Sequence, residues 1–127
     1  MTGDPIVIVE DDDNIAELLG FMFRREGFAP VVLRDGRAAQ EHVASHPPPA
    51  AVVLDVMLPY RDGFAVAVAI RSDPRWKDVP IVMLTARSFP SDVERGKDLG
   101  VADFVLKPFQ PQALVGRIKK IVRPVAG

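Results

Sequence analysis

Polar side chains directly follow four of the apolar runs in this sequence. Glu10 and Asp11 follow the first run, Asp55 follows the third, Thr85 the fourth and Lys107 the fifth. If the corresponding strands are neighbours in a parallel sheet, three carboxylates, a hydroxyl and an ammonium group meet at one edge of that sheet. Each residue taken alone has an ordinary explanation as a helix cap, a turn residue or a surface charge. Four such explanations would have to coincide at the same strand ends, so the pattern indicates one site.

The chemistry of these groups points to phosphoryl transfer. Three carboxylates in a partly desolvated cleft repel one another, so the site requires a cation in addition to Lys107. Mg²⁺ meets this need, because it binds through one or two carboxylates together with waters and phosphate oxygens. The sequence contains no His or Cys cluster that would suit a softer metal such as zinc. A carboxylate beside Mg²⁺, with a lysine and a hydroxyl nearby, suits attack on phosphorus, and Asp55 is the predicted nucleophile.

The elements that must position these residues alternate between strand and helix. Residues 5–9 form a β-branched run without polar alternation, which is typical of a strand buried on both faces. Further strands are predicted over residues 28–33, 51–54, 81–84 and 104–106. Five strands that alternate with five helices through short connections predict an α/β fold with an open, doubly wound parallel sheet. Ligands of such sheets bind beyond the carboxyl ends of the strands.

Apolar spacing and capping residues define the predicted helices. The first helix carries an apolar stripe, begins at Asp13 as its N-cap and ends at Gly27. Residues 36–45 and 64–71 form the second and third helices, and Ser91 caps a fourth that ends near Gly100. Pro124 stops the last helix. The predicted buried positions of the first and last helices are Ile15, Leu18, Leu19, Met22 and Phe23, and Leu114, Val115, Ile118, Ile121 and Val122.

Three conspicuous side chains lie away from the strand ends. His42 and His46 belong to the second helix or its end, and we interpret them as surface residues. Trp76 follows the third helix and is interpreted as a loop anchor.

Composition and charge restrict the class of protein. The chain has 127 residues, enough for one domain with a real core, and a formal net charge of -1, so it has no bulk attraction to nucleic acid or anionic membrane. The absence of cysteine excludes disulfides, thiolate metal sites and a Cys nucleophile. The longest apolar stretch, residues 64–70, is too short to span a bilayer. We therefore expect a cytoplasmic protein that binds neither nucleic acid nor membrane directly.

The ordered set of motifs resembles the receiver domain of response regulators in two-component signal transduction. The resemblance covers nearly the whole chain. Its motifs are Val9-Glu10-Asp11-Asp12, Leu54-Asp55-Val56-Met57-Leu58-Pro59 with Asp62-Gly63, Leu84-Thr85-Ala86, Gly100 with Asp103-Phe104, and Lys107-Pro108-Phe109. This resemblance implies a flavodoxin-like receiver fold with strand order 2-1-3-4-5. It also implies phosphorylation of Asp55 by a sensor histidine kinase or a histidine phosphotransfer protein.

The resemblance assigns Mg²⁺ to Asp11 directly, to Glu10 through water, and to Asp55 and the carbonyl of Met57. Lys107 is expected to bind a phosphoryl oxygen, and its bond to Pro108 is expected to be cis.

The resemblance further implies a conformational switch. Thr85 is expected to bind the phosphoryl group once it is formed, and Phe104 occupies the aromatic switch position, where the ring moves from an exposed toward a buried site. Phosphorylation adds about 1.5–2 negative charges and three hydrogen-bond acceptors. The affected surface comprises the fourth helix, the fifth strand and the fifth helix, and it is expected to act on a downstream effector domain or protein.

Some positions depart from the related transcription factors that dimerise through a charged network on this surface. Asp103 and Arg117 match that network, but Leu99, Ala102 and Ala113 stand where charged residues are common. Symmetric dimerisation of that kind is not expected, and a phosphorylation-dependent dimer of another kind stays open.

The residues around the predicted nucleophile also indicate how long the phosphoryl group persists. Met57 and Arg87 flank the expected approach of hydrolytic water, which predicts slow autodephosphorylation.

Two alternative functions remain at this point. A metal-dependent phosphohydrolase with an aspartate nucleophile would use an Asp-x-Asp pair such as Asp11 and Asp13, but it leaves Asp55 and Lys107 unexplained. A non-phosphorylated interaction module would not need this costly cluster of charges. The favoured hypothesis is a signalling switch rather than a turnover enzyme. Residues 1–123 form the receiver domain, and 124–127 are a C-terminal tail or the start of a linker.

Overall fold

The computed structural model of the chain describes residues 3–86 and 89–122. The strands are β1 (Pro5–Val9), β2 (Ala29–Leu33), β3 (Ala51–Asp55), β4 (Ile81–Thr85) and β5 (Asp103–Leu106). The helices are α1 (Asp13–Arg25), α2 (Gly36–Ser45), α3 (Gly63–Ser72), α4 (Pro90–Asp98) and α5 (Pro111–Ile121). Neighbouring strands are parallel throughout, in the order β2-β1-β3-β4-β5. The predicted α/β fold and strand order are confirmed.

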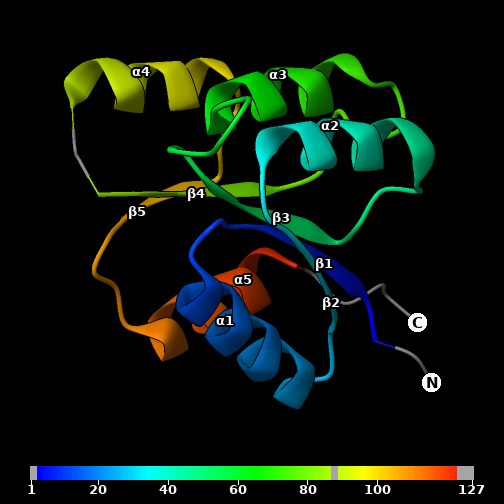
Figure 1. Cartoon of the computed structure of the whole chain (residues 1–127), viewed down its shortest axis with the longest axis vertical. Coiled ribbons are helices and arrows are strands. Elements are labelled where there is room, and N and C mark those ends of the chain that lie inside the picture. The colour runs from blue at the N-terminus through cyan, green and yellow to red at the C-terminus, as the bar shows by residue number, and fades with distance from the viewer. Residues whose placement is uncertain (1–2, 87–88, 123–127) are drawn as a thin grey trace.

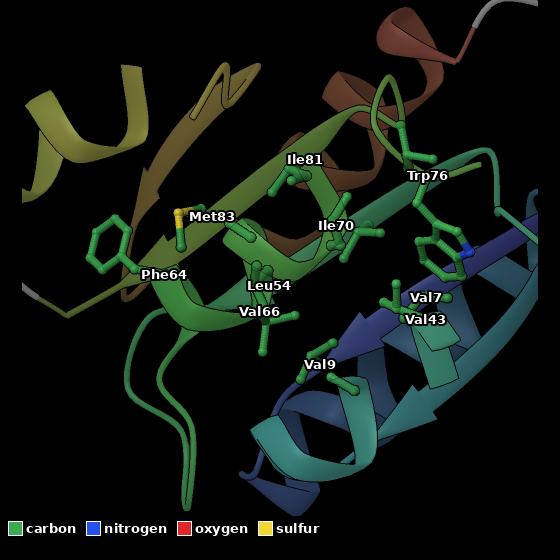
Figure 2. Close-up of a cluster of buried hydrophobic side chains, with 14 of the residues drawn as sticks. Val7, Val9, Val43, Leu54, Phe64, Val66, Ile70, Trp76, Ile81 and Met83 are labelled. Carbon is green, nitrogen blue, oxygen red and sulfur yellow. The ribbon is translucent and has the colours of Figure 1, made fainter. Parts of the chain in front are cut away.

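Helices cover both faces of the sheet (Figure 1). α2, α3 and α4 lie on one face, and α1 and α5 lie on the other. Side chains alternate between the faces along each strand. In β1, Val7 and Val9 therefore belong to the apolar cluster under α2 and α3, whereas Ile6 and Ile8 belong to the cluster under α1 and α5 (Figure 2 shows the first cluster). Because both faces are covered, the strands carry apolar runs without polar alternation.

The N-cap of α1 is Asp12, so the prediction of Asp13 was wrong. Asp12 has extended backbone angles, and its Oδ1 accepts a hydrogen bond from the N–H of Ile15 at 3.0 Å. Asp13 is the first helical residue, and its carboxylate pairs with Arg34. Consecutive acids all favour a helix N-terminus, so only the backbone geometry decides which one is the cap.

The buried face of α1 differs from the predicted stripe. Leu19 and Phe23 are fully buried, as expected, but Leu18 is 45% exposed. The small residues Ala16 and Gly20 complete the buried face instead. Small side chains let the helix pack closely on the sheet, and this turns Leu18 toward solvent.

The start of α4 also differs from the prediction, because Ser91 is not its cap. The helix begins at Pro90, and the N-cap is Phe89, whose side chain cannot accept a hydrogen bond. Proline suits the first helical position, since its missing N–H has no partner in the helix. Gly100 lies just beyond the helix with a φ of +67°, close to the predicted end.

The segment after α3 secures the end of α2. Trp76 is fully buried, and its Nε1 donates a hydrogen bond to the carbonyl of His46 at 3.0 Å, so this residue is the anchor that the sequence predicted. Arg75 donates to the carbonyls of Val43 and His46 at 2.7 and 3.1 Å. The rings of His42 and His46 stack with centroids 3.9 Å apart. Both histidines lie at the end of α2, remote from the carboxyl edge of the sheet.

The helices within residues 3–86 and 89–122 are short or amphipathic. None of them combines the length and apolar character needed to span a bilayer. The predicted stop of the last helix at Pro124 and the proposed tail at 124–127 lie outside the described residues.

Candidate active site

The predicted site residues lie at the carboxyl ends of four adjacent strands. Asp55 and Thr85 are the last residues of β3 and β4, Glu10 follows β1 directly, and Lys107 follows β5 directly. β1, β3, β4 and β5 are consecutive neighbours in the sheet. The parallel arrangement therefore brings residues that are far apart in the chain to one edge.

Three carboxylates form the centre of this site. The side chains of Glu10, Asp11 and Asp55 each place a carboxylate oxygen within 4.8 Å of the others. Glu10 is 0% exposed and Asp55 is 3% exposed, whereas Asp11 lies at the solvent side. Such close like charges are unfavourable unless cations compensate them.

Lys107 provides one compensating charge. Its Nζ lies 2.9 Å from Asp55 Oδ2, to which it donates a hydrogen bond, and 2.7 Å from Glu10 Oε1. The side chain of Lys107 is 20% exposed, so the ammonium group lies between the buried acids and solvent. One ammonium group facing three carboxylates leaves an excess of negative charge.

The charges alter the proton affinities of the site. Burial, together with the nearby Asp55, raises the pKa of Glu10 above its ordinary value. Partial desolvation and the neighbouring Glu10 raise the pKa of Asp11. Although burial alone would lower the pKa of Lys107, its hydrogen bond to Asp55 and its ion pair with Glu10 raise it, so the ammonium form is favoured.

Backbone groups orient two of the carboxylates. The N–H of Met57 donates to Asp55 Oδ1 at 3.3 Å, and the N–H of Asp12 donates to Glu10 Oε2 at 3.2 Å. The side chain of Met57 itself is 56% exposed beside the cleft. Both oxygens of Asp55 are therefore held, one by a backbone amide and the other by Lys107.

Gly63 positions the loop that follows Asp55, a role that its place in the Asp62-Gly63 motif did not specify. A Cβ at this position would lie 2.2 Å from the carbonyl oxygen of Asp55. The N–H of Gly63 also donates to the carbonyl of Val56 at 2.8 Å. The first turn of α3 can pack directly on the end of β3 only without a side chain here.

Thr85 and Phe104 lie on the β5 side of the cleft. Thr85 is fully buried, and its carbonyl accepts a hydrogen bond from the N–H of Lys107 at 2.7 Å. Phe104 is partly buried and packs against the cluster under α2 and α3. The peptide bond between Lys107 and Pro108 is cis, as the resemblance implied.

An apolar groove adjoins the site on the α1 side. Its volume is about 380 Å³, and it reaches Lys107. The groove lies between α1 and the segment that joins β5 to α5. Its lining residues are Ile15, Leu18, Leu19, Ala86, Lys107, Pro108, Phe109 and Pro111. The exposed Leu18, predicted as a core residue, is part of this surface.

Asp13 of the sequence hypotheses lies away from the cleft, and Arg87 is not among the described residues. Asp13 points to Arg34, and within the described residues the carboxylate cluster consists of Glu10, Asp11 and Asp55. The Asp-x-Asp pair that a phosphohydrolase would use is thus not assembled. Arg87, which was expected to flank the approach of water, lies outside the described residues.

The donor set fits a hard cation. Glu10 Oε1 is buried and, among the described residues, has no hydrogen-bond donor in suitable geometry, although Lys107 lies close to it. Three carboxylates without sulfur or imidazole partners match the oxygen-rich coordination that such cations prefer.

Comparison with known proteins agrees with the geometry. The family model of the response regulator receiver domain matches residues 6–119. The chain is 42% identical over 118 residues to the DNA-binding response regulator MtrA of Mycolicibacterium smegmatis, which covers 93% of this chain and 50% of MtrA. It is 36% identical over 121 residues to the phosphate regulon transcriptional regulatory protein PhoB of Escherichia coli, covering 95% of this chain and 52% of PhoB. The chain therefore spans about half the length of these curated relatives.

A solved structure shows the same architecture. The receiver domain of the sensor histidine kinase PA1611 from Pseudomonas aeruginosa has a TM-score of 0.83 and 28% identity, with 94% of this chain and 98% of that chain covered. In that protein a magnesium ion is coordinated in the active-site cleft. The matching fold, the polar residues at the strand ends and the family match together place this chain in the response regulator receiver domain family.

Proposed function

We propose that Asp55 accepts a phosphoryl group from a phosphohistidine of a sensor kinase or phosphotransfer protein. The observation that carries this proposal is the buried Asp55 carboxylate, held at 2.9 Å by Lys107 within a cluster of three acids at the carboxyl edge. A residue that served only to cap a helix would not need two further carboxylates beside it.

The reaction moves the phosphoryl group from nitrogen to oxygen. A carboxylate oxygen of Asp55 attacks phosphorus, the P–O bond forms, and the P–N bond of the donor breaks with the electron pair leaving on imidazole nitrogen. Lys107 is placed to bind an equatorial phosphoryl oxygen, because its Nζ already contacts Asp55. Later hydrolysis returns Asp55 to the free carboxylate and releases inorganic phosphate.

The reaction is proposed to depend on Mg²⁺. Asp11, Asp55 and the carbonyl of Met57 would bind the ion directly, and Glu10 would bind it through water. When bound, the ion neutralises negative charge that develops on the phosphoryl oxygens. The buried Glu10 Oε1 and the excess of carboxylates support this assignment.

The phosphoryl group is proposed to switch the surface formed by α4, β5 and α5. Its added charge and acceptors supply new partners for Thr85 and Lys107. Movement of Thr85 toward the phosphoryl group allows Phe104 to take a more buried position. Phe104 has no hydroxyl group, so packing rather than a hydrogen bond must favour that position. An effector domain or protein that binds this surface would read the change.

The apolar groove is proposed to receive the phosphodonor. A protein donor must hold its phosphohistidine over a nearly buried Asp55, so it requires a docking surface that adjoins the cleft. The groove reaches Lys107, and Leu18 presents an apolar side chain in it that is 45% exposed. A helix with an apolar face fits this surface.

Mass spectrometry of the intact protein tests the proposal. We expect incubation with acetyl phosphate and Mg²⁺ to add one phosphoryl group to the wild type and none to Asp55→Asn. Asparagine keeps the size of the side chain but removes the nucleophilic carboxylate. Equal phosphorylation of both proteins, or no phosphorylation of the wild type, would refute the assignment. Steady turnover of a free phosphate ester would instead support a phosphohydrolase.

A further inference from the structure

Few residues of α4 are buried. All of its residues belong to the described part of the chain, and of these only Asp92 and Gly96 are buried. The helix covers the β5 end of the sheet (Figure 1). A glycine in the interior of a helix weakens it relative to alanine. Gly96 has ordinary helical backbone angles, so its surroundings rather than the conformational freedom of glycine explain its presence.

The ring of Phe104 lies against the bare backbone of Gly96. A Cβ at Gly96 would be 3.3 Å from Cδ2 and 3.4 Å from Cε2 of Phe104, and 3.7 Å from Cβ of Val101. The distance to Cδ2 is shorter than ordinary van der Waals contact between carbon atoms, and the distance to Cε2 lies at its lower limit. A methyl group at position 96 therefore requires the ring or the helix to move by a few tenths of an ångström.

The helix is less free to move than the ring. Arg71 donates hydrogen bonds to the carbonyls of Leu99 and Gly100, at 2.7 and 3.1 Å, and so holds the end of α4 to α3. Arg95 of α4 lies 4.1 Å from the centre of the Phe64 ring, which belongs to the buried cluster (Figure 2). These contacts hold α4 on both sides of Gly96 in the chain. We therefore expect a side chain at position 96 to displace the partly buried ring of Phe104 rather than the helix.

The opposite side of Phe104 leads to the active site. Phe104 pairs with Met83 across β4 and β5, and Leu106 pairs with Thr85. Because side chains alternate along a strand, Met83 and Thr85 share the face on which Phe104 lies. Displacement of the ring from α4 along this face of the sheet brings it toward the side chains that end at Thr85.

We propose that Gly96 is a positioning residue for Phe104 and thereby sets the phosphoryl affinity of the Asp55 cleft. Because Gly96 has no side chain, the ring of Phe104 can pack directly on the backbone of α4 instead of moving toward Thr85. This inference rests on the proposed function, in which the phosphorylated protein favours the more buried ring. A substitution that destabilises the ring position against Gly96, relative to the more buried position, must then raise the affinity for the phosphoryl group by thermodynamic linkage.

Beryllofluoride, a phosphoryl analogue, allows the affinity to be measured without a kinase. We expect Gly96→Ala to bind beryllofluoride with Mg²⁺ about fivefold more tightly than the wild type in isothermal titration calorimetry. Gly116→Ala is the matched control, because it also replaces a helical glycine but has no atom within 4 Å of the new Cβ. It should leave the affinity unchanged. Unchanged or weaker binding by Gly96→Ala would overturn the inference.

The role of Phe104 is tested by a double-mutant cycle. In a Phe104→Ala background, Gly96→Ala should no longer change the affinity, because the ring is absent. Phe104→Leu serves the same purpose if the alanine variant does not unfold cooperatively. An undiminished effect in this background would show that Gly96 acts on the helix alone and would overturn its role toward Phe104.

The position of the ring gives a second readout. NMR spectra of the protein without beryllofluoride should show Phe104 ring resonances shifted in Gly96→Ala and unshifted in Gly116→Ala. If the wild type binds no beryllofluoride, the proposed function has failed. If it binds normally and Gly96→Ala matches it, only the inference about Gly96 has failed.

Discussion

At the scale of single residues, the site is defined by unfavourable charge. Glu10 and Asp55 are nearly buried beside Asp11, and Lys107 is a cation that contacts both buried acids. Isolated acids of this kind would cost stability, and natural proteins retain such costs where function needs them. We therefore expect the carboxylates to make the chain less stable than it would be with neutral residues at the same positions.

The first prediction concerns this repulsion between carboxylates. Asp55→Asn should raise the free energy of unfolding in the absence of divalent cations by on the order of 1 kcal/mol, because one of three neighbouring negative charges disappears. Mg²⁺ should stabilise the wild type more than the variant. Urea unfolding with and without Mg²⁺ measures both effects. A less stable variant would mean that the bond to Lys107 outweighs the repulsion.

A second residue-scale prediction concerns backbone strain next to the site. Tyr60 has a φ of 70°, a region that bulky residues rarely adopt, and its side chain is 66% exposed with Arg37 above the ring at 4.4 Å. Tyr60→Gly should raise the free energy of unfolding by about 0.5–1 kcal/mol, which urea unfolding measures.

The reciprocal control for Tyr60 is Gly27→Ala. Gly27 has a φ of +90°, and a Cβ added there would have no atom within 4 Å, so alanine adds strain without a clash. It should lower the free energy of unfolding by about 1 kcal/mol in the same denaturant experiment. Effects of the same sign for both variants would contradict the argument from φ.

At the scale of elements, arginines after and within α3 tie the neighbouring helices down. Arg75 binds the last carbonyls of α2, and Arg71 binds those at the end of α4. Arg71 also donates to the carbonyls of Lys77 and Val79, before β4. Hydrogen bonds from α3 and the segment after it therefore attach the ends of α2 and α4 to the middle of this helix layer.

The third prediction follows from these bonds. Arg71→Lys should lower the free energy of unfolding by about 2 kcal/mol. The planar guanidinium group of Arg71 donates hydrogen bonds to four backbone carbonyls at once, and the single ammonium group of lysine cannot replace all of them. Amide hydrogen exchange in α4 should accelerate more than exchange in α2. Uniform acceleration in both helices would argue against a specific attachment of α4.

The fourth prediction tests the groove beside α1. Leu18→Asp should reduce phosphotransfer from a purified, phosphorylated histidine phosphotransfer domain by about tenfold or more, since a charge replaces an apolar contact in the interface. Phosphorylation by acetyl phosphate should stay unchanged, because a small donor needs no docking surface.

Val68→Asp is the matched control for Leu18→Asp. Val68 is 49% exposed, similar to Leu18, but it lies on α3 at the other face of the sheet. Both reactions should proceed normally with this variant. Equal losses with both variants would indicate a general effect of the added charge.

At the scale of the whole molecule, the net charge of -1 averages over separate regions. Acids gather at the carboxyl edge of the sheet, whereas α1 and α5 end in Arg24, Arg25, Lys119 and Lys120 at the opposite edge. The balanced total therefore conceals a strongly anionic cleft. The net charge bears on the solubility of the protein, whereas the fold determines which charged side chains come close enough to form a reactive site.

The fifth prediction concerns assembly. Asp103 and Arg117, which match the charged dimer network of related transcription factors, pair with each other within one chain. Leu99, Ala102 and Ala113 carry no charge, so these positions cannot contribute ion pairs to a symmetric charged interface. Light scattering after chromatography should give a monomer mass with and without beryllofluoride. A doubled mass with beryllofluoride would show that another contact drives dimerisation.

Local patterns in the amino-acid sequence are enough to predict the strands and helices, their succession along the chain and the polar residues at the carboxyl edge. Apolar runs and helical spacing are local signals, and a parallel sheet joins its strand ends at one edge. Glu10, Asp55, Thr85 and Lys107 could therefore be grouped from their positions in the chain alone. The strand order came from the family resemblance.

Features that depend on helix rotation, local backbone angles or contacts between distant segments became visible in the folded chain. Asp12 rather than Asp13 caps α1, Leu18 faces the groove, and Gly96 receives the ring of Phe104. Each depends on the rotation of a helix about its axis or on backbone angles at a single residue. A sequence pattern specifies which residues are apolar, acidic or small, but the packing of neighbouring elements decides which of them meet.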